Sequence, residues 1–204
     1  MPSKPNIAIL IVAAGASTRF GRPKQLLPWR NSTLIGHAIN SAIALQKAHI
    51  YVVLGANYRL IKPEIAASGV HILNNENWQE GLGSSIAVGA KYLLENATDL
   101  NGVFVMLGDQ PLISVAYLEA MHTEFGKGAH KIIATSYGDK KYGVPTIFDV
   151  SFFAELTKLC DDKGAKGLIN QNLDTVTAVD LKPILTDIDT QEDYENLRKT
   201  SRQS

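Results

Sequence analysis

The sequence has one cysteine, Cys160, among 204 residues. A single cysteine excludes an internal disulfide framework and a thiolate metal cluster, and we expect Cys160 to be a small buried hydrophobe on a helix. Long apolar runs are missing as well: none approaches the roughly 18 residues of a membrane span, and the opening MPSKPN is too short and polar for a signal peptide. The sequence therefore predicts a cytoplasmic protein without a membrane partner.

An excess of charge of either sign is also absent, since 20 Lys and Arg residues balance 20 Asp and Glu residues. No overall field favours nucleic acid as a partner, so any anion binding must be local. The apolar fraction of 45% is ordinary for a globular protein. A chain of this length buries a full core, and we expect one domain over residues 1–204.

Strand-like and helix-like segments alternate along the chain. The apolar run at 7–12 is typical of a strand that is buried on both faces. Further strands are expected at 50–55, 70–73, 103–109, 131–137, 144–148 and 174–180, and helices at 32–48, 58–67, 84–96, 114–125, 151–160, 164–171 and after Thr190. This order predicts an α/β fold, a Rossmann-like three-layer α/β/α arrangement with a mostly parallel sheet. Ligands of such sheets bind beyond the carboxyl ends of the strands, where the strand order reverses.

The loop after the first strand combines small residues with cations. The residues from Ala13 to Ser17 let backbone N–H groups approach an anion, while Arg19 and Lys24 supply positive charge. The loop matches neither the Walker A pattern nor the dinucleotide fingerprint G-x-G-x-x-G. An ordinary solvated loop has the same composition. Its position after the most buried strand favours ligand binding.

A carboxylate stands at the carboxyl end of the strand expected at 103–109. Asp109, in the stretch V-F-V-M-L-G-D-Q-P-L, is placed at the edge of the sheet that also carries the first loop. A carboxylate beside a triphosphate suits Mg²⁺, which prefers one or two carboxylates together with phosphate oxygens and water. Alternatively, Asp109 opens a turn by bonding its own backbone.

The stretch N-E-N-W-Q-E-G-L-G-S-S-I at 75–86 joins a strand to a helix. One interpretation is structural, with Gly81 and Gly83 forming the turn and Ser84 capping the helix. The other is functional, because a helix N-terminus with free N–H groups and two hydroxyls is an anion site.

The stretch I-V-A-A-G-A-S-T-R-F-G-R-P-K-Q-L-L-P resembles the signature of nucleotidyltransferases, most of all the molybdenum cofactor cytidylyltransferases. The fold that this resemblance implies is the nucleotide-diphospho-sugar transferase type. The resemblance implies nucleotide binding for five residues of the first loop: Ala13, Ala14, Gly15, Arg19 and Lys24. The guanylyl-transferring relatives typically read L-A-G-G, so Ala14 favours CTP.

The resemblance extends to three other stretches. A similar N-x-x-W-x-x-G-x-x-S-S implies that Gly81, Ser84 and Ser85 meet the nucleotide or the acceptor phosphate. The family's L-x-D-Q-P implies a metal-binding role for Asp109, and its D-x-D-T-P-E-D implies that Asp189 is the second Mg²⁺ carboxylate. Asp189 or Thr190 equally suits a helix N-cap. The stretch D-D-K-G-A-K-G at 161–167 is similar to a family segment near the acceptor.

The resemblance implies transfer of CMP from CTP to the terminal phosphate of molybdopterin, with release of pyrophosphate. Lys24, Arg19 and Asp109 are the expected catalytic residues, with Mg²⁺ as cofactor and a client molybdoenzyme as a further partner. The N-terminal half is expected to bind mainly the nucleotide, and the C-terminal half mainly the acceptor. Alternatives are a molybdopterin guanylyltransferase, a sugar-phosphate nucleotidyltransferase and a non-catalytic module that delivers the finished cofactor. A Rossmann oxidoreductase is the weakest alternative, because the glycine fingerprint is missing.

Overall fold

The computed structural model describes residues 5–45, 49–128, 131–180, 188 and 190–200. Seven strands form one sheet: β1 (Ile7–Ala13), β4 (Ile50–Leu54), β5 (His71–Asn74), β6 (Gly102–Leu107), β7 (Ile132–Ser136), β8 (Tyr142–Asp149) and β9 (Val176–Asp180). The helices are α1 (Leu34–Leu45), α2 (Tyr58–Ile65), α3 (Leu82–Asn96), α4 (Val115–Gly126), α5 (Phe153–Leu156), α6 (Lys166–Gln171) and α7 (Gln191–Thr200). The short strands β2 (Pro28–Trp29) and β3 (Ser32–Thr33) form a separate hairpin.

The large sheet has the strand order β5-β4-β1-β6-β8-β7-β9. Strand β1 pairs in parallel with both β4 and β6, while β8 is antiparallel to β6 and to β7. The expected α/β fold with a mostly parallel sheet is confirmed. Because β4 lies on one side of β1 and β6 on the other, the strand order reverses at β1.

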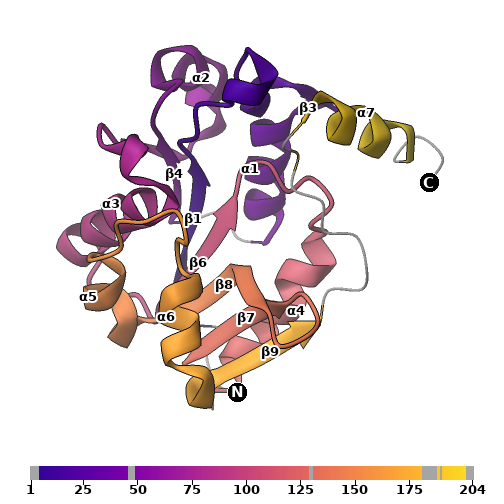
Figure 1. Ribbon diagram of the computed structural model, residues 1–204. Coiled ribbons are helices and arrows are strands. Elements are labelled where there is room, and N and C mark those ends of the chain that lie inside the picture. Colours follow the sequence, from indigo (N-terminus) through magenta and orange to yellow (C-terminus); the bar gives the residue numbers. More distant parts are fainter. Residues whose placement is uncertain (1–4, 46–48, 129–130, 181–187, 189, 201–204) are drawn as a thin grey trace.

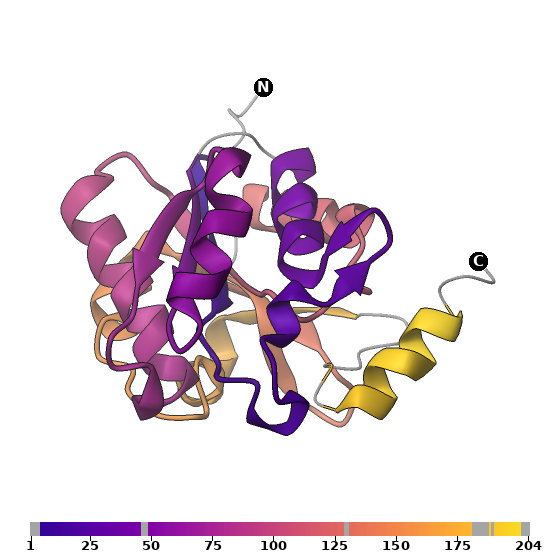
Figure 2. The ribbon, with the colours of Figure 1, turned by 90° about the horizontal axis from the view of Figure 1, so that it is seen from above.

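Helices cover both faces of this sheet (Figures 1 and 2). Every residue of β1 is buried. Its odd-numbered residues, such as Ile9, pack in one cluster with residues of α1, α2 and α4. Its even-numbered residues, such as Leu10, pack in a second cluster with residues of α3, α5 and α6. Burial of β1 on both faces explains why its sequence is continuously apolar rather than alternating.

Helix α7 lies at the edge of the molecule beside the β2–β3 hairpin (Figure 1). Leu197 of α7 packs in a third cluster with Leu27 and Trp29. The hydroxyl of Tyr194 donates to the carbonyl of Pro28 at 2.6 Å. The helix begins with a reciprocal cap, since Thr190 and Asp193 bond each other's backbone N–H groups. The chain that follows the first loop is thereby fixed against the C-terminal helix.

Three local expectations were wrong. The helix expected at 151–160 is reduced to the single turn of α5, preceded by a 3₁₀ turn at Val150–Phe152. Cys160 therefore lies beyond the helix and is exposed, not buried. Ser84 does not cap α3: the helix begins at Leu82 with Gly81 as its N-cap residue.

No helix within the described residues is long and apolar enough to cross a membrane.

Candidate active site

A cavity of about 370 Å³ lies beyond the carboxyl ends of β1 and β6. The predicted site residues that line it are Ala13, Ala14, Gly15, Lys24, Gly81, Ser85 and Asp109. These residues come from the first loop, the N-terminal turn of α3 and the end of β6. The cavity thus lies at the strand-order reversal, where the fold predicts a ligand site.

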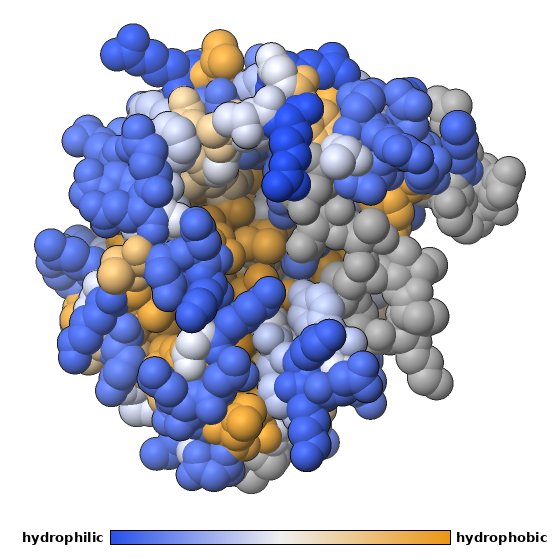
Figure 3. Space-filling view, in the orientation of Figure 1, coloured by the Kyte–Doolittle hydropathy of each residue, from blue (hydrophilic) through white to orange (hydrophobic). Residues whose placement is uncertain are grey.

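The cavity has an apolar wall as well as charged groups. Val12, Trp78, Leu82 and Leu107 belong to its lining. On this face of the molecule, apolar residues gather in a central hollow that hydrophilic residues surround (Figure 3). Such a combination, apolar walls with a few polar groups, is typical of a small-molecule site.

Lys24 and Asp109 face each other in this cavity. The Nζ atom of Lys24 lies 2.7 Å from Oδ2 of Asp109, and the two side chains are 14% and 18% exposed. Lys24 Nζ also donates to the backbone carbonyl of Ile188 at 2.8 Å. Two residues predicted for phosphate and metal binding are therefore in direct contact at the rim of the sheet.

The first loop is fixed by Gln25, a residue that the sequence analysis did not single out. Its side chain is 2% exposed. Its Nε2 atom donates to the carbonyls of Ala13 at 3.2 Å and Gly15 at 3.0 Å, and its Oε1 atom accepts from the hydroxyl of Ser17 at 3.2 Å. Ser17 in turn accepts from the backbone N–H of Lys24 at 3.1 Å. Gln25 therefore joins the beginning of the loop to its end.

These bonds also orient the backbone of the loop. In a trans peptide the C=O of one residue and the N–H of the next point in opposite directions. Since the carbonyl of Gly15 points at Gln25, the N–H of Ala16 points away from it. Ala16 lines the cavity. The small residues of the loop therefore present backbone, rather than large side chains, to the cavity.

The N-terminal turn of α3 is held by Asn75, which is 2% exposed. Its Nδ2 atom donates to the hydroxyls of Ser84 and Ser85, each at 2.9 Å. Ser84 donates to the carbonyls of Asn77 and Gly81, so its hydroxyl is used within the turn. Ser85 lines the cavity, whereas Ser84 does not belong to its lining.

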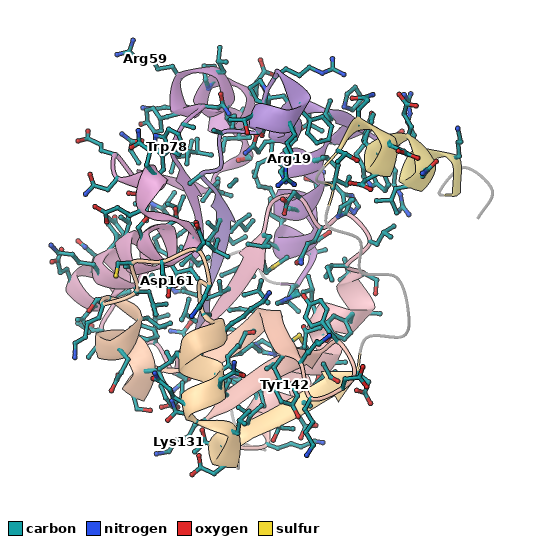
Figure 4. All side chains as sticks on the ribbon, viewed as in Figure 1. Arg19, Arg59, Trp78, Lys131, Tyr142 and Asp161 are labelled. Carbon is teal, nitrogen blue, oxygen red and sulfur yellow. The ribbon has the colours of Figure 1, made fainter. Side chains whose placement is uncertain are left out.

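Arg19 and Asp189 are the remaining predicted site residues, and among the described residues Arg19 does not belong to the cavity lining. Arg19 is exposed on the short 3₁₀ turn Thr18–Phe20 and projects from it toward the middle of the molecule (Figure 4). Asp189, the second predicted metal ligand, lies outside the described residues.

Trp78 and Asp162 line the cavity although neither was predicted as a site residue. Trp78 packs against Gly55 and the first loop: a Cβ atom on Gly55 would lie 2.6 Å from Cβ of Trp78 and 2.8 Å from the carbonyl oxygen of Ala14. Trp78 stands in the N-x-x-W motif and Asp162 in the 161–167 stretch. The sequence analysis considered both stretches, but their patterns alone do not predict which side chains face the cavity.

Burial affects one titratable group beside the site. It lowers the pKa of His37, on α1, and the nearby charge of Arg30 lowers the pKa further. A hydrogen bond with the backbone of Pro111 acts in the opposite direction and raises this pKa. His37 thereby connects α1 to the loop that follows Asp109.

The donor set suits a hard divalent cation. The carboxylate of Asp109 is an oxygen ligand beside Lys24 and the cavity. Within the described part of the chain, no group of three or more His, Cys, Asp or Glu residues gathers around a common point. A Mg²⁺ ion held by Asp109 would take its other ligands from phosphate oxygens and water.

The family model of the MobA-like NTP transferase domain matches residues 9–176. Nicotine blue oxidoreductase of Paenarthrobacter nicotinovorans is 30% identical to this chain over 196 residues, which cover 92% of this chain and 94% of that protein.

Solved structures give the same fold. The protein Rv0371c of Mycobacterium tuberculosis has a TM-score of 0.84 and 29% identity, covering 97% of this chain and 99% of its own. Its manganese complex has a TM-score of 0.80 and 28% identity, covering 96% and 99%. A nucleotidyl transferase of Methanothermobacter, at 19% identity and a TM-score of 0.80, covers 98% of this chain and 99% of its own and shows the fold alone.

Proposed function

We propose that this chain, which belongs to the MobA-like NTP transferase family, transfers CMP from CTP to the terminal phosphate of molybdopterin and releases pyrophosphate. Nucleotidyl transfer is the reaction class that the family supports. The observation that carries the proposal is the contact between Lys24 and Asp109 at the mouth of a cavity lined by the first loop.

The proposed reaction needs no general base. A phosphate monoester has its second pKa near 6 and is already a nucleophilic dianion at neutral pH. The reaction needs neutralised charge between two polyanions and in-line alignment of the reacting groups. In this proposal Lys24 and Arg19 neutralise the triphosphate, and the backbone N–H groups from Ala13 to Ala16 hold its oxygens.

Asp109 and Asp189 are the carboxylates that would hold Mg²⁺ in this reaction. The metal, when bound, supplies positive charge to the phosphates. Gly81, Ser84 and Ser85 complete the nucleotide site in the proposal. Ser85 contacts the ligand from the cavity wall, while Ser84 acts by fixing the turn through its bonds to Asn77 and Gly81.

The choice of CTP as the nucleotide and of molybdopterin as the acceptor is supported by fewer observations than the reaction class. Ala14 lines the cavity at the place where the guanylyl-transferring relatives carry glycine, which supports CTP. The 161–167 stretch borders the same cavity through Asp162, which supports an acceptor on that side. Two alternatives use the same chemistry: transfer of GMP from GTP to molybdopterin, and transfer of a nucleotide to a sugar phosphate. A module that only delivers the finished cofactor to a molybdoenzyme would tolerate loss of Asp109.

An oxidoreductase is the second candidate function, because the relative from P. nicotinovorans is named as one. The first loop reads A-A-G-A-S and lacks the glycine fingerprint of dinucleotide-binding enzymes. The two functions separate in one assay, since only an oxidoreductase changes the absorbance of NADH or NADPH.

The experiment that tests the proposal measures pyrophosphate release from each of the four NTPs, with and without molybdopterin, in Mg²⁺ and in Mn²⁺. We expect release only with CTP and molybdopterin together. Release with GTP assigns the guanylyl reaction, and release that requires a sugar phosphate assigns the third alternative. No release with any pair, combined with oxidation of NADPH, contradicts the transferase function.

A further inference from the structure

Asp162 is an exposed residue on the side of the candidate active site where we propose that the acceptor binds. Asp162 lines the cavity together with Gly81 and Leu82. Its Oδ1 atom is packed against Gly81 so closely that a Cβ atom on this glycine would lie 2.5 Å from it. Gly81 has φ +99, a conformation that favours glycine. The absence of a side chain at Gly81 therefore makes room for the carboxylate.

The segment that carries Asp162 is attached to the N-terminal turn of α3. The N–H of Gly83 donates to the carbonyl of Asp161 at 2.7 Å, and the side chain of Asp161 accepts from the N–H of Lys163 at 3.0 Å. Gly164, with φ +57, packs against Leu82. These contacts position the backbone of Asp162 relative to the cavity without using its carboxylate.

The carboxylate of Asp162 has no hydrogen bond or ion pair within the part of the chain that the structure describes. Lys24 belongs to the first loop, whereas the segment of Asp162 is attached to the N-terminal turn of α3. Within the lining, Lys24 is paired with Asp109, whereas the carboxylate of Asp162 is not paired with a cation of the described residues.

A ligand that complements this lining offers N–H donors to the carboxylate of Asp162 while its phosphate meets the first loop. An ionised carboxylate only accepts hydrogen bonds, so it favours a ring that carries an amino group and disfavours a ring that presents a carbonyl there. The apolar wall formed by Trp78 and Leu82 suits the faces of such a ring.

We propose that Asp162 is a specificity-determining residue that accepts hydrogen bonds from an amino-substituted heterocycle in this cavity. This inference rests on the proposed function, since it assumes that the cavity takes a nucleotide and a phosphorylated acceptor. The amino group has two possible sources, the cytosine of CTP and the ring of a pterin acceptor. Both carry the same donor beside a ring nitrogen.

The first test measures the Kd of CTP and of UTP without acceptor for the wild type, Asp162→Asn and the control Asp161→Asn. UTP replaces the amino group of the base with a carbonyl. An asparagine amide donates as well as accepts. Where cytosine is the source, Asp162→Asn binds CTP more weakly and UTP more tightly, so that the CTP preference falls about 10- to 100-fold. The control leaves the preference unchanged, because the amide oxygen of the Asp161→Asn side chain still accepts from the N–H of Lys163.

The second test distinguishes the acceptor as the source. It measures binding of pterin and of its dioxo analogue lumazine, by their fluorescence, to the same variants in the presence of CTP. A preference for pterin that is lost in Asp162→Asn, with an unchanged ratio of CTP to UTP, assigns the amino group to the acceptor.

Two results overturn the inference. If Asp162→Asn changes neither the ratio of CTP to UTP affinity nor the ratio of pterin to lumazine affinity, Asp162 does not recognise an amino group. If the variant binds CTP and UTP more tightly by the same factor, the carboxylate only repels the triphosphate. Either result leaves the proposed transfer intact. Failure of the wild type to bind any nucleotide contradicts the proposed function itself and removes the inference with it.

Discussion

Lys24 Nζ and Asp109 Oδ2 are 2.7 Å apart, although one residue belongs to the first loop and the other follows β6. The same ammonium group donates to the carbonyl of Ile188. Both charges are largely shielded from solvent, at 14% and 18% exposure. The ammonium group of Lys24 therefore joins the first loop, the end of β6 and the segment before α7. Replacement of Lys24 or of Asp109 tests the proposed chemistry directly.

Replacement of Asp109 by alanine is expected to abolish transfer while the protein remains folded. Removal of one charge-stabilising group of an active site costs roughly 10²–10³ in kcat, and loss of a metal carboxylate adds to this. The measurement is pyrophosphate release at saturating CTP and Mg²⁺, with Tm as the check on folding. Asp99→Ala is the matched control, an exposed carboxylate before the amino end of the same strand. Full activity of Asp109→Ala in Mg²⁺ would exclude the metal role.

Replacement of Lys24 by methionine keeps most of the side-chain volume and removes the charge. We expect kcat to fall by roughly 10²–10³, because the charge on the triphosphate is less neutralised in the transition state. The control is Arg22→Met, an exposed cation of the same loop that does not line the cavity. Equal losses in the two variants would indicate an unspecific effect of loop charge.

Gln25 offers a test of loop geometry that leaves every charged site residue in place. Gln25→Glu preserves the shape of the side chain but replaces the amide that donates to Ala13 and Gly15. An unsatisfied buried group costs about 1–3 kcal/mol, so we expect a lower Tm and a higher KM for CTP. Gln171→Glu, at an exposed position of α6, is the control. A lower Tm with unchanged KM would mean that Gln25 serves the fold alone.

The sequence predicted the order of strands and helices because burial of β1 on both faces leaves an uninterrupted apolar run. The cavity position followed from the same pattern, since parallel strands bring their carboxyl ends to one edge. Lys24 and Asp109 were therefore predicted at a common rim, and the structure brings them into contact.

What the sequence did not predict depends on contacts between distant segments. In the sequence Gln25 is a polar residue beside two leucines, and nothing in that pattern predicts that it is buried. In the folded loop its side chain donates to the carbonyls of Ala13 and Gly15. The exposure of Cys160 follows from the early end of α5, where the chain leaves the helix to pack on the α3 turn. Spacing in the sequence carries no information on such packing.

Stability is expected to fall as the pH drops below the ordinary pKa of histidine, about 6.5. Because the pKa of His37 is lowered in the folded protein, the unfolded chain binds the proton first, and protonation favours unfolding between pH 6.5 and the lowered value. His37→Gln removes this contribution. Denaturant unfolding of both proteins at about pH 7.5 and about pH 5.5, on either side of the ordinary pKa, measures it. A wild type that loses no more stability than the variant would contradict the assignment.

Gly55 tests whether the first loop and Trp78 must approach as closely as they do. In Gly55→Ala the new methyl group would lie 2.6 Å from Cβ of Trp78 and 2.8 Å from the carbonyl oxygen of Ala14, so one of them must move. Such overpacking costs about 1–3 kcal/mol, and because both neighbours line the cavity we expect CTP to bind more weakly as well. The control is Gly167→Ala in α6, where an added Cβ atom meets nothing within 4 Å and alanine favours the helix. Calorimetric Tm and the Kd of CTP are measured on both variants, and an unchanged Kd for Gly55→Ala would show that the wall around Trp78 takes no part in nucleotide binding.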